Sequence, residues 1–196
     1  MRILCDVDGV FADFTGHALS TMGELAPVGG EEEITTWDMF SHLSPEARCL
    51  SERAWREQGW CSGIPVYPEA LWAYGKLESI GKVIWVTSPM VNAPYWCHER
   101  TLWLQRYFRA ELEDIILTSG KYHVCGDVLI DDKIENLEKW CKHNPQGFGI
   151  LWDQPYNRAW VPGAQAIRAR TWEEVILLLT GLKSQKTLKG TTFIRV

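Results

Sequence analysis

Residues 3–10 read Ile3-Leu4-Cys5-Asp6-Val7-Asp8-Gly9-Val10, a short apolar run that meets two acids and a glycine. The apolar part predicts a strand from Ile3 to Val7 that is buried on both faces. Two carboxylates at the end of such a strand repel each other and lose solvation, and a divalent cation such as Mg²⁺ would compensate both effects. The alternative is a solvated turn, because Asp and Gly are common in loops. Asp6 and Asp8 are therefore candidate metal ligands.

The same pattern, a short apolar run followed by polar residues, recurs along the chain. Apolar residues at helical spacing separate these runs, which predicts alternating strands and helices. We therefore predict an α/β fold with a doubly wound, Rossmann-like, mostly parallel sheet that binds ligands at the carboxyl ends of its strands. Further strands are expected at 83–86, 115–117, 128–130, 148–151 and 166–167, and helices at 70–79, 95–108 and 172–182.

One interval interrupts this alternation. Between Phe14 and Ile64 no strand is evident, and the chain shows only helix-like patches such as 45–58 and loops rich in Gly and Glu. The simplest interpretation is a small helical cap inserted after the first strand. We assign 1–15 and 76–183 to the core, 16–75 to the cap, and 184–196 to a C-terminal tail that is either flexible or an edge strand.

Composition restricts the class of partner. The formal net charge of -5 argues against a polymeric nucleic acid or an anionic membrane as the partner, because binding either one needs a surplus of Lys and Arg that this chain lacks. Most of the 11 Trp are expected to pack in the core. Cys5 and Cys125 lie beside strand-like runs and are interpreted as small buried hydrophobes. The N-terminus lacks a signal core and no apolar window reaches the length of a membrane span, so we expect a cytoplasmic protein.

Polar side chains also follow the second and third predicted strands. Thr87 and Ser88 can donate hydrogen bonds to phosphate oxygens, although Ser and Thr in this position also cap helices. Lys121 would bring a positive charge to an anionic centre, whereas a solvated lysine is the default interpretation for any single Lys. Neither the hydroxyl pair nor the lysine, taken alone, distinguishes a phosphate-binding site from these structural alternatives.

Adjacent acids, Asp131 and Asp132, directly follow the fourth predicted strand and repeat the arrangement of the first. Because side chains diverge on extended backbone, one acid can meet a metal while the other bonds to a donor such as Lys121. A parallel sheet gathers its carboxyl ends on one edge, so the four pieces are expected to form one site.

The order Asp-x-Asp-Gly-Val, Thr-Ser, Lys and Asp-Asp resembles the four motifs of the haloacid-dehalogenase (HAD) superfamily. Within it, the chain resembles the 5'(3')-deoxyribonucleotidases from residue 1 to about 160, closely in the core and loosely in the cap. The segments that carry this resemblance are Asp6-Val-Asp-Gly-Val-Phe-Ala-Asp-Phe14, Thr87-Ser-Pro89, the Glu99-Arg100…Trp103 helix, Gly126-Asp-Val-Leu-Ile-Asp-Asp132 and Trp152-Asp-Gln-Pro-Tyr-Asn-Arg158.

The resemblance implies a Mg²⁺-dependent phosphatase that acts on (deoxy)nucleoside monophosphates. It implies that Asp6 is the nucleophile, which forms an aspartyl-phosphate, and that Asp8 is the general acid and base. The implied metal ligands are the Asp6 carboxylate, the Asp8 backbone carbonyl and the acid pair. Of that pair we favour Asp132 as the direct ligand, with Asp131 behind it.

The remaining roles also come from the resemblance. Thr87, Ser88, Lys121 and Arg100 are expected to bind the phosphoryl oxygens. A homodimer is suggested by the resemblance alone. A flat base would stack on aromatic residues of the cap, each of which could equally pack in the cap core: Phe14, Trp37, Phe40, Trp55 and Trp60.

Three alternatives stay open. The same core would serve a phosphatase for another small metabolite such as a sugar phosphate. A phosphoacceptor signalling domain also combines acids, a Thr or Ser and a Lys on a doubly wound sheet, but it places the acid pair at its first strand and lacks both the cap and an equivalent of Asp8. The third alternative is a non-catalytic binding protein with this fold. The sequence gives it no support, because no catalytic position is missing.

Overall fold

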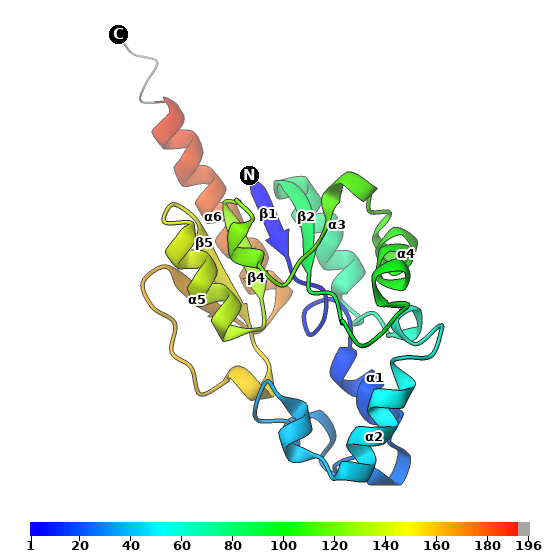
Figure 1. The fold of residues 1–196 in the computed structure, drawn as a ribbon. Helices are drawn as coiled ribbons and strands as arrows, with labels where there is room; N and C mark the ends of the chain where they lie inside the picture. Colours follow the sequence, from blue (N-terminus) through cyan, green and yellow to red (C-terminus); the bar gives the residue numbers. More distant parts are fainter. Residues whose placement is uncertain (192–196) are drawn as a thin grey trace.

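The computed structural model describes residues 1–191, apart from the side chains of 42 and 186–191. Its strands form one six-stranded sheet, in the order β3-β2-β1-β4-β5-β6, and every pair of neighbours is parallel. This confirms the predicted doubly wound α/β fold (Figure 1). The strands are β1 (Arg2–Cys5), β2 (Lys82–Thr87), β3 (Ile115–Leu117), β4 (Val128–Asp131), β5 (Phe148–Trp152) and β6 (Ala166–Ala169).

Helices cover both faces of the sheet, because successive strand residues point to opposite sides. Ile3 and Cys5 belong to the larger cluster of buried residues, to which α3, α4 and α6 contribute, whereas Leu4 belongs to the cluster under α5. The helices are α3 (Ala70–Ile80), α4 (Trp96–Phe108), α5 (Ile134–His143) and α6 (Trp172–Thr191). Seven of the 11 Trp are buried, as core packing predicts: Trp55, Trp60, Trp85, Trp96, Trp103, Trp140 and Trp172.

Strand β1 ends at Cys5, earlier than the predicted Val7, because the chain turns there. The Val7 carbonyl accepts the backbone N–H groups of Phe11 and Ala12, at 2.8 and 2.9 Å. Asp6 and Asp8 thus lie beyond the paired residues of β1, on a tight loop at the carboxyl edge of the sheet.

The inserted segment contains α1 (Phe14–Ser20), α2 (Pro45–Ala54) and several short 3₁₀ turns, and lies beyond the carboxyl ends of the strands (Figure 1). Its two connections to the core pair with each other. Asp13 N–H donates to Pro65 O and Tyr67 N–H to Phe11 O, each at 2.9 Å. The boundary predicted at residue 75 falls inside α3, which is one continuous helix. We propose that the cap comprises 14–64.

Some local predictions differ from the structure. The helix predicted over 45–58 ends at Ala54, and the tail predicted at 184–196 continues α6 as far as Thr191, with 192–196 outside the described residues. Cys125 is exposed, so its interpretation as a buried hydrophobe is wrong; Cys5 is buried as predicted. Among residues 1–191, no helix is both long and apolar enough to cross a membrane.

Candidate active site

Asp6 is the first residue after β1, and its carboxylate is tightly placed. Oδ1 accepts the backbone N–H of Val7 at 2.7 Å, and Oδ2 lies 2.5 Å from Lys121 Nζ. Burial raises the pKa of the Asp6 carboxyl, Lys121 lowers it in part, and the charge of Asp8 raises it further. The ionised form of Asp6 therefore depends on a cation close by.

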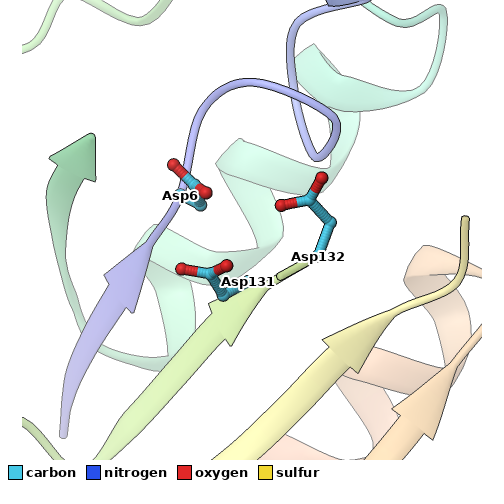
Figure 2. A group of neighbouring side chains, drawn as sticks. All are labelled: Asp6, Asp131 and Asp132. Carbon is cyan, nitrogen blue, oxygen red and sulfur yellow. The ribbon is translucent and has the colours of Figure 1, made fainter. Parts of the chain in front are cut away.

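The acid pair at the end of β4, Asp131 in the strand and Asp132 directly after it, lies close to Asp6 (Figure 2). One carboxylate oxygen from each of Asp6, Asp131 and Asp132 lies within 4.8 Å of the others, and all three residues are buried. Lys121, which is 1% exposed, pairs with Asp6 and, at 2.8 Å, with Asp131. Three carboxylates and one ammonium group leave two negative charges uncompensated when all are ionised. A divalent cation would offset them, and Mg²⁺ prefers oxygen ligands of this kind, so the residues fit Mg²⁺.

The pKa values of Asp131 and Asp132 reflect the same excess of negative charge. Burial raises the pKa of Asp131 to about 6, with Lys121 lowering it in part and Asp6 raising it. Burial, followed by the charges of Asp6 and Asp131, raises the pKa of Asp132 well above its usual range. Full ionisation of the three acids is thus unfavourable unless further positive charge is bound.

The two acids of the pair have different partners. Both oxygens of Asp131 accept hydrogen bonds: Oδ2 from Lys121 Nζ, Oδ1 from the backbone N–H of Lys133 at 2.8 Å, and both from Asn136 Nδ2, at 3.2 and 3.1 Å. Asp132 Oδ2 accepts a hydrogen bond from the Tyr156 hydroxyl. Within the described chain, no group donates to Asp132 Oδ1. Asp132 therefore has an oxygen available for a ligand, whereas Asp131 does not.

Asp8 pairs with Arg100 on α4. Arg100 Nη2 lies 2.5 Å from Asp8 Oδ1, and the guanidinium lies between the rings of Trp96 and Trp103, 4.9 and 5.0 Å from their centroids. Arg100 is fully buried and, like Lys121, is not among the residues that line the cavity described below. Burial raises the pKa of Asp8, and Arg100 lowers it in part.

The hydroxyl pair stands at the end of β2. Thr87 is buried, and its Oγ1 has no hydrogen-bond partner among the described residues. Ser88 Oγ is 3.4 Å from Thr118 O, a long contact at an exposed position. Both residues line the same cavity as Asp6 and Asp8. A buried hydroxyl without a partner is unfavourable, and a ligand oxygen in the cavity would satisfy that of Thr87.

The cavity has a volume of about 490 Å³ and lies between the carboxyl edge of the sheet and the cap. Of the five aromatic residues predicted for a base pocket, Phe14, Trp37 and Phe40 line it. Trp37 is 55% exposed, and Lys133 Nζ lies over its ring, 3.2 Å from the centroid. The predicted aromatic wall is therefore present in part.

The other two predicted pocket residues, Trp55 and Trp60, are buried behind this wall. Trp55 packs edge-on against Phe40 with centroids 5.2 Å apart, and Trp60 packs against Phe14 at 5.7 Å. Neither lines the cavity, so in this structure they support the lining residues from the cap core.

Comparison with known proteins agrees with this geometry. The family model described as "5' nucleotidase, deoxy (Pyrimidine), cytosolic type C protein" matches residues 1–186. The chain belongs to this deoxyribonucleotidase family. The 5'(3')-deoxyribonucleotidase of Bacillus subtilis is 31% identical over 178 residues, which covers 88% of this chain and 95% of the relative. The mitochondrial 5'(3')-deoxyribonucleotidase of Homo sapiens is 32% identical over 145 residues, 68% of this chain and 62% of the relative.

Membership of the deoxyribonucleotidase family makes the protein a phosphoric monoester hydrolase of the HAD type. A HAD-hydrolase of Bacillus subtilis, solved bound to magnesium, has the same fold with a TM-score of 0.55 and 13% identity, covering 91% of this chain and 97% of the other. The phosphoacceptor and non-catalytic alternatives are thereby set aside.

Several residues of this deoxyribonucleotidase-family site were missed by sequence reasoning. Tyr156 falls within the quoted segment Trp152–Arg158, but its type gave no reason to expect a contact with Asp132. Asn136 lies on α5, which was not predicted although Ile134, Leu137 and Cys141 have helical spacing. Other lining residues that were not predicted are Thr15, Asp38, Met39, Met90, Trp96 and Ser119.

Proposed function

We propose that this deoxyribonucleotidase-family enzyme depends on Mg²⁺ and hydrolyses deoxynucleoside monophosphates through an aspartyl-phosphate on Asp6. The observation that carries the proposal is the group of three buried carboxylates, two of which are bridged by the buried Lys121, beside a cavity with an aromatic wall. An acid that serves only to stabilise the fold would not be placed beside two others with so little compensating charge.

The metal ligands proposed are the Asp6 carboxylate, the Asp8 carbonyl and Asp132, with Asp131 holding Lys121 behind them. The available Oδ1 of Asp132 and the fully occupied oxygens of Asp131 support this order. When bound, Mg²⁺ neutralises charge on the phosphoryl group and on the carboxylate that approaches it.

The reaction is proposed to consist of two displacements. Asp6 attacks phosphorus, the bond from phosphorus to the ester oxygen breaks, and Asp8 protonates the leaving oxygen. Water then attacks phosphorus, Asp8 takes its proton, and inorganic phosphate leaves as the Asp6 carboxylate is regenerated. The raised pKa of Asp8 supports this role because its protonated form persists closer to neutral pH, and Arg100 keeps the side chain in place.

The phosphoryl oxygens are proposed to bind Thr87, Ser88 and Lys121. The unpartnered Thr87 hydroxyl supports this assignment. The base is proposed to stack against the wall formed by Phe14, Trp37 and Phe40.

Substrate class is tested by kcat/KM across deoxynucleoside monophosphates, their ribonucleotide counterparts and sugar phosphates. A deoxynucleoside monophosphate should exceed the best sugar phosphate by at least about tenfold, since only the nucleotide can use the aromatic wall. Chelation of Mg²⁺ should remove turnover of every substrate. Equal rates on all compounds, or a sugar phosphate as the best substrate, would reject the nucleotidase assignment in favour of another phosphometabolite.

A further inference from the structure

The loop between β5 and β6 makes two contacts with Asp132. The Tyr156 hydroxyl donates to Asp132 Oδ2, and Asn157 Nδ2 donates to the backbone carbonyl of Asp132 at 2.8 Å. A third contact reaches the loop that carries Asp8: Gln154 Nε2 donates to Gly9 O at 2.6 Å. One segment thus touches the two loops that hold the acids.

This segment is itself held by Arg168, on β6. Nη1 donates to Asp153 Oδ1 at 2.7 Å and to Asn157 Oδ1 at 2.5 Å, while Nη2 donates to the carbonyls of Asn157 and Trp160, each at 2.8 Å. Four hydrogen bonds from one guanidinium, two to side chains and two to backbone carbonyls, hold the segment on both sides of Tyr156. These hydrogen bonds therefore hold the loop that carries Tyr156 in place next to Asp132.

We infer that Tyr156 is a positioning residue for the divalent cation: its hydroxyl holds Asp132 in the orientation that lets it share an ion with Asp6. The inference rests on the proposed function. Asp132 is repelled by Asp6 and Asp131, and without a donor on Oδ2 its carboxylate is free to turn away from them. Outer partners of metal-binding carboxylates typically change affinity by about 10- to 100-fold when removed.

The test is the Tyr156→Phe variant, which removes only the hydroxyl. Its dissociation constant for Mg²⁺, measured by calorimetry without substrate, should rise by about 10- to 100-fold. The rate it loses at low Mg²⁺ should be largely recovered at saturating Mg²⁺, because the defect lies in occupancy of the site. Damage to packing or to substrate binding would not be rescued in this way.

A matched control is Tyr74→Phe. The Tyr74 hydroxyl donates to Glu78 Oε1 at 2.7 Å, which is also a tyrosine–carboxylate hydrogen bond, but it lies on α3 away from the acids. This variant should bind Mg²⁺ as the unmodified protein does.

A second variant, Arg168→Met, tests the bracing of the loop. It should weaken Mg²⁺ binding less than Tyr156→Phe does, and adding it to Tyr156→Phe should weaken binding little further, because both changes act through the same hydroxyl. Mg²⁺ binding that is unchanged or tighter in Tyr156→Phe overturns the inference, as does a rate loss that persists at saturating Mg²⁺. If the unmodified protein itself neither binds Mg²⁺ nor hydrolyses nucleotides, the proposed function fails instead.

Discussion

Replacing Asp6 by Asn will reduce kcat on a deoxynucleoside monophosphate by at least about 10⁴-fold, because an amide cannot act as the nucleophile towards phosphorus. The fold should persist, since Asn can still accept the Val7 N–H that Asp6 accepts at 2.7 Å. Steady-state kinetics at saturating Mg²⁺ measure the loss, and circular dichroism with a thermal melt establishes that the variant is folded.

The control for this variant is Asp114→Asn. Asp114 Oδ2 lies 2.5 Å from Lys82 Nζ, the same separation as in the Asp6–Lys121 pair, but Lys82 is the first residue of β2, at the opposite edge of the sheet. Loss of this ion pair should leave kcat within about twofold. Substantial turnover by Asp6→Asn would contradict the assignment of the nucleophile.

Replacing Lys121 by Met will lower the free energy of unfolding by about 3–5 kcal/mol at pH 7, because it leaves buried carboxylates without their cation. Lys121 is 1% exposed and bridges Asp6 and Asp131, so water cannot take its place easily. Urea denaturation measures the change. Lys82→Met, which removes a lysine from an ion pair at an exposed position, should have a much smaller effect.

The penalty for losing Lys121 should depend on pH. The pKa of Asp131 is already raised to about 6 with the lysine in place, and removal of a positive charge raises it further. At pH 5 the Asp131 carboxyl is then largely protonated, and the missing cation costs less than at pH 7. The same loss of stability at both pH values would be inconsistent with this explanation.

The sheet and the catalytic edge could be predicted because the signals are local. Short apolar runs that end in Asp6, Thr87 and Asp131 combine strand formation with charge in a way that a buried parallel sheet explains. Topology then brings the strand ends together, so spacing along the chain was enough to propose the acid cluster.

Contacts that depend on side-chain direction could not be predicted. The turn of α4 places the Arg100 guanidinium between two Trp rings and against Asp8, contacts that the sequence alone does not indicate. Trp55 and Trp37 are both cap aromatics, but only the latter lines the cavity. The contact of Tyr156 with Asp132 joins residues 24 positions apart. No local pattern specifies which tyrosine makes it.

The most direct test of the account is to trap the intermediate on the unmodified protein. The enzyme is quenched in acid during turnover of a radiolabelled deoxynucleoside monophosphate with Mg²⁺, reduced with borohydride and digested for peptide mass spectrometry. Because borohydride reduces an aspartyl-phosphate to homoserine with release of its phosphate, we predict homoserine in place of Asp6, found only when substrate and Mg²⁺ are both supplied. Hydrolysis that proceeds with this reduction product at another residue, and not at position 6, would contradict the account.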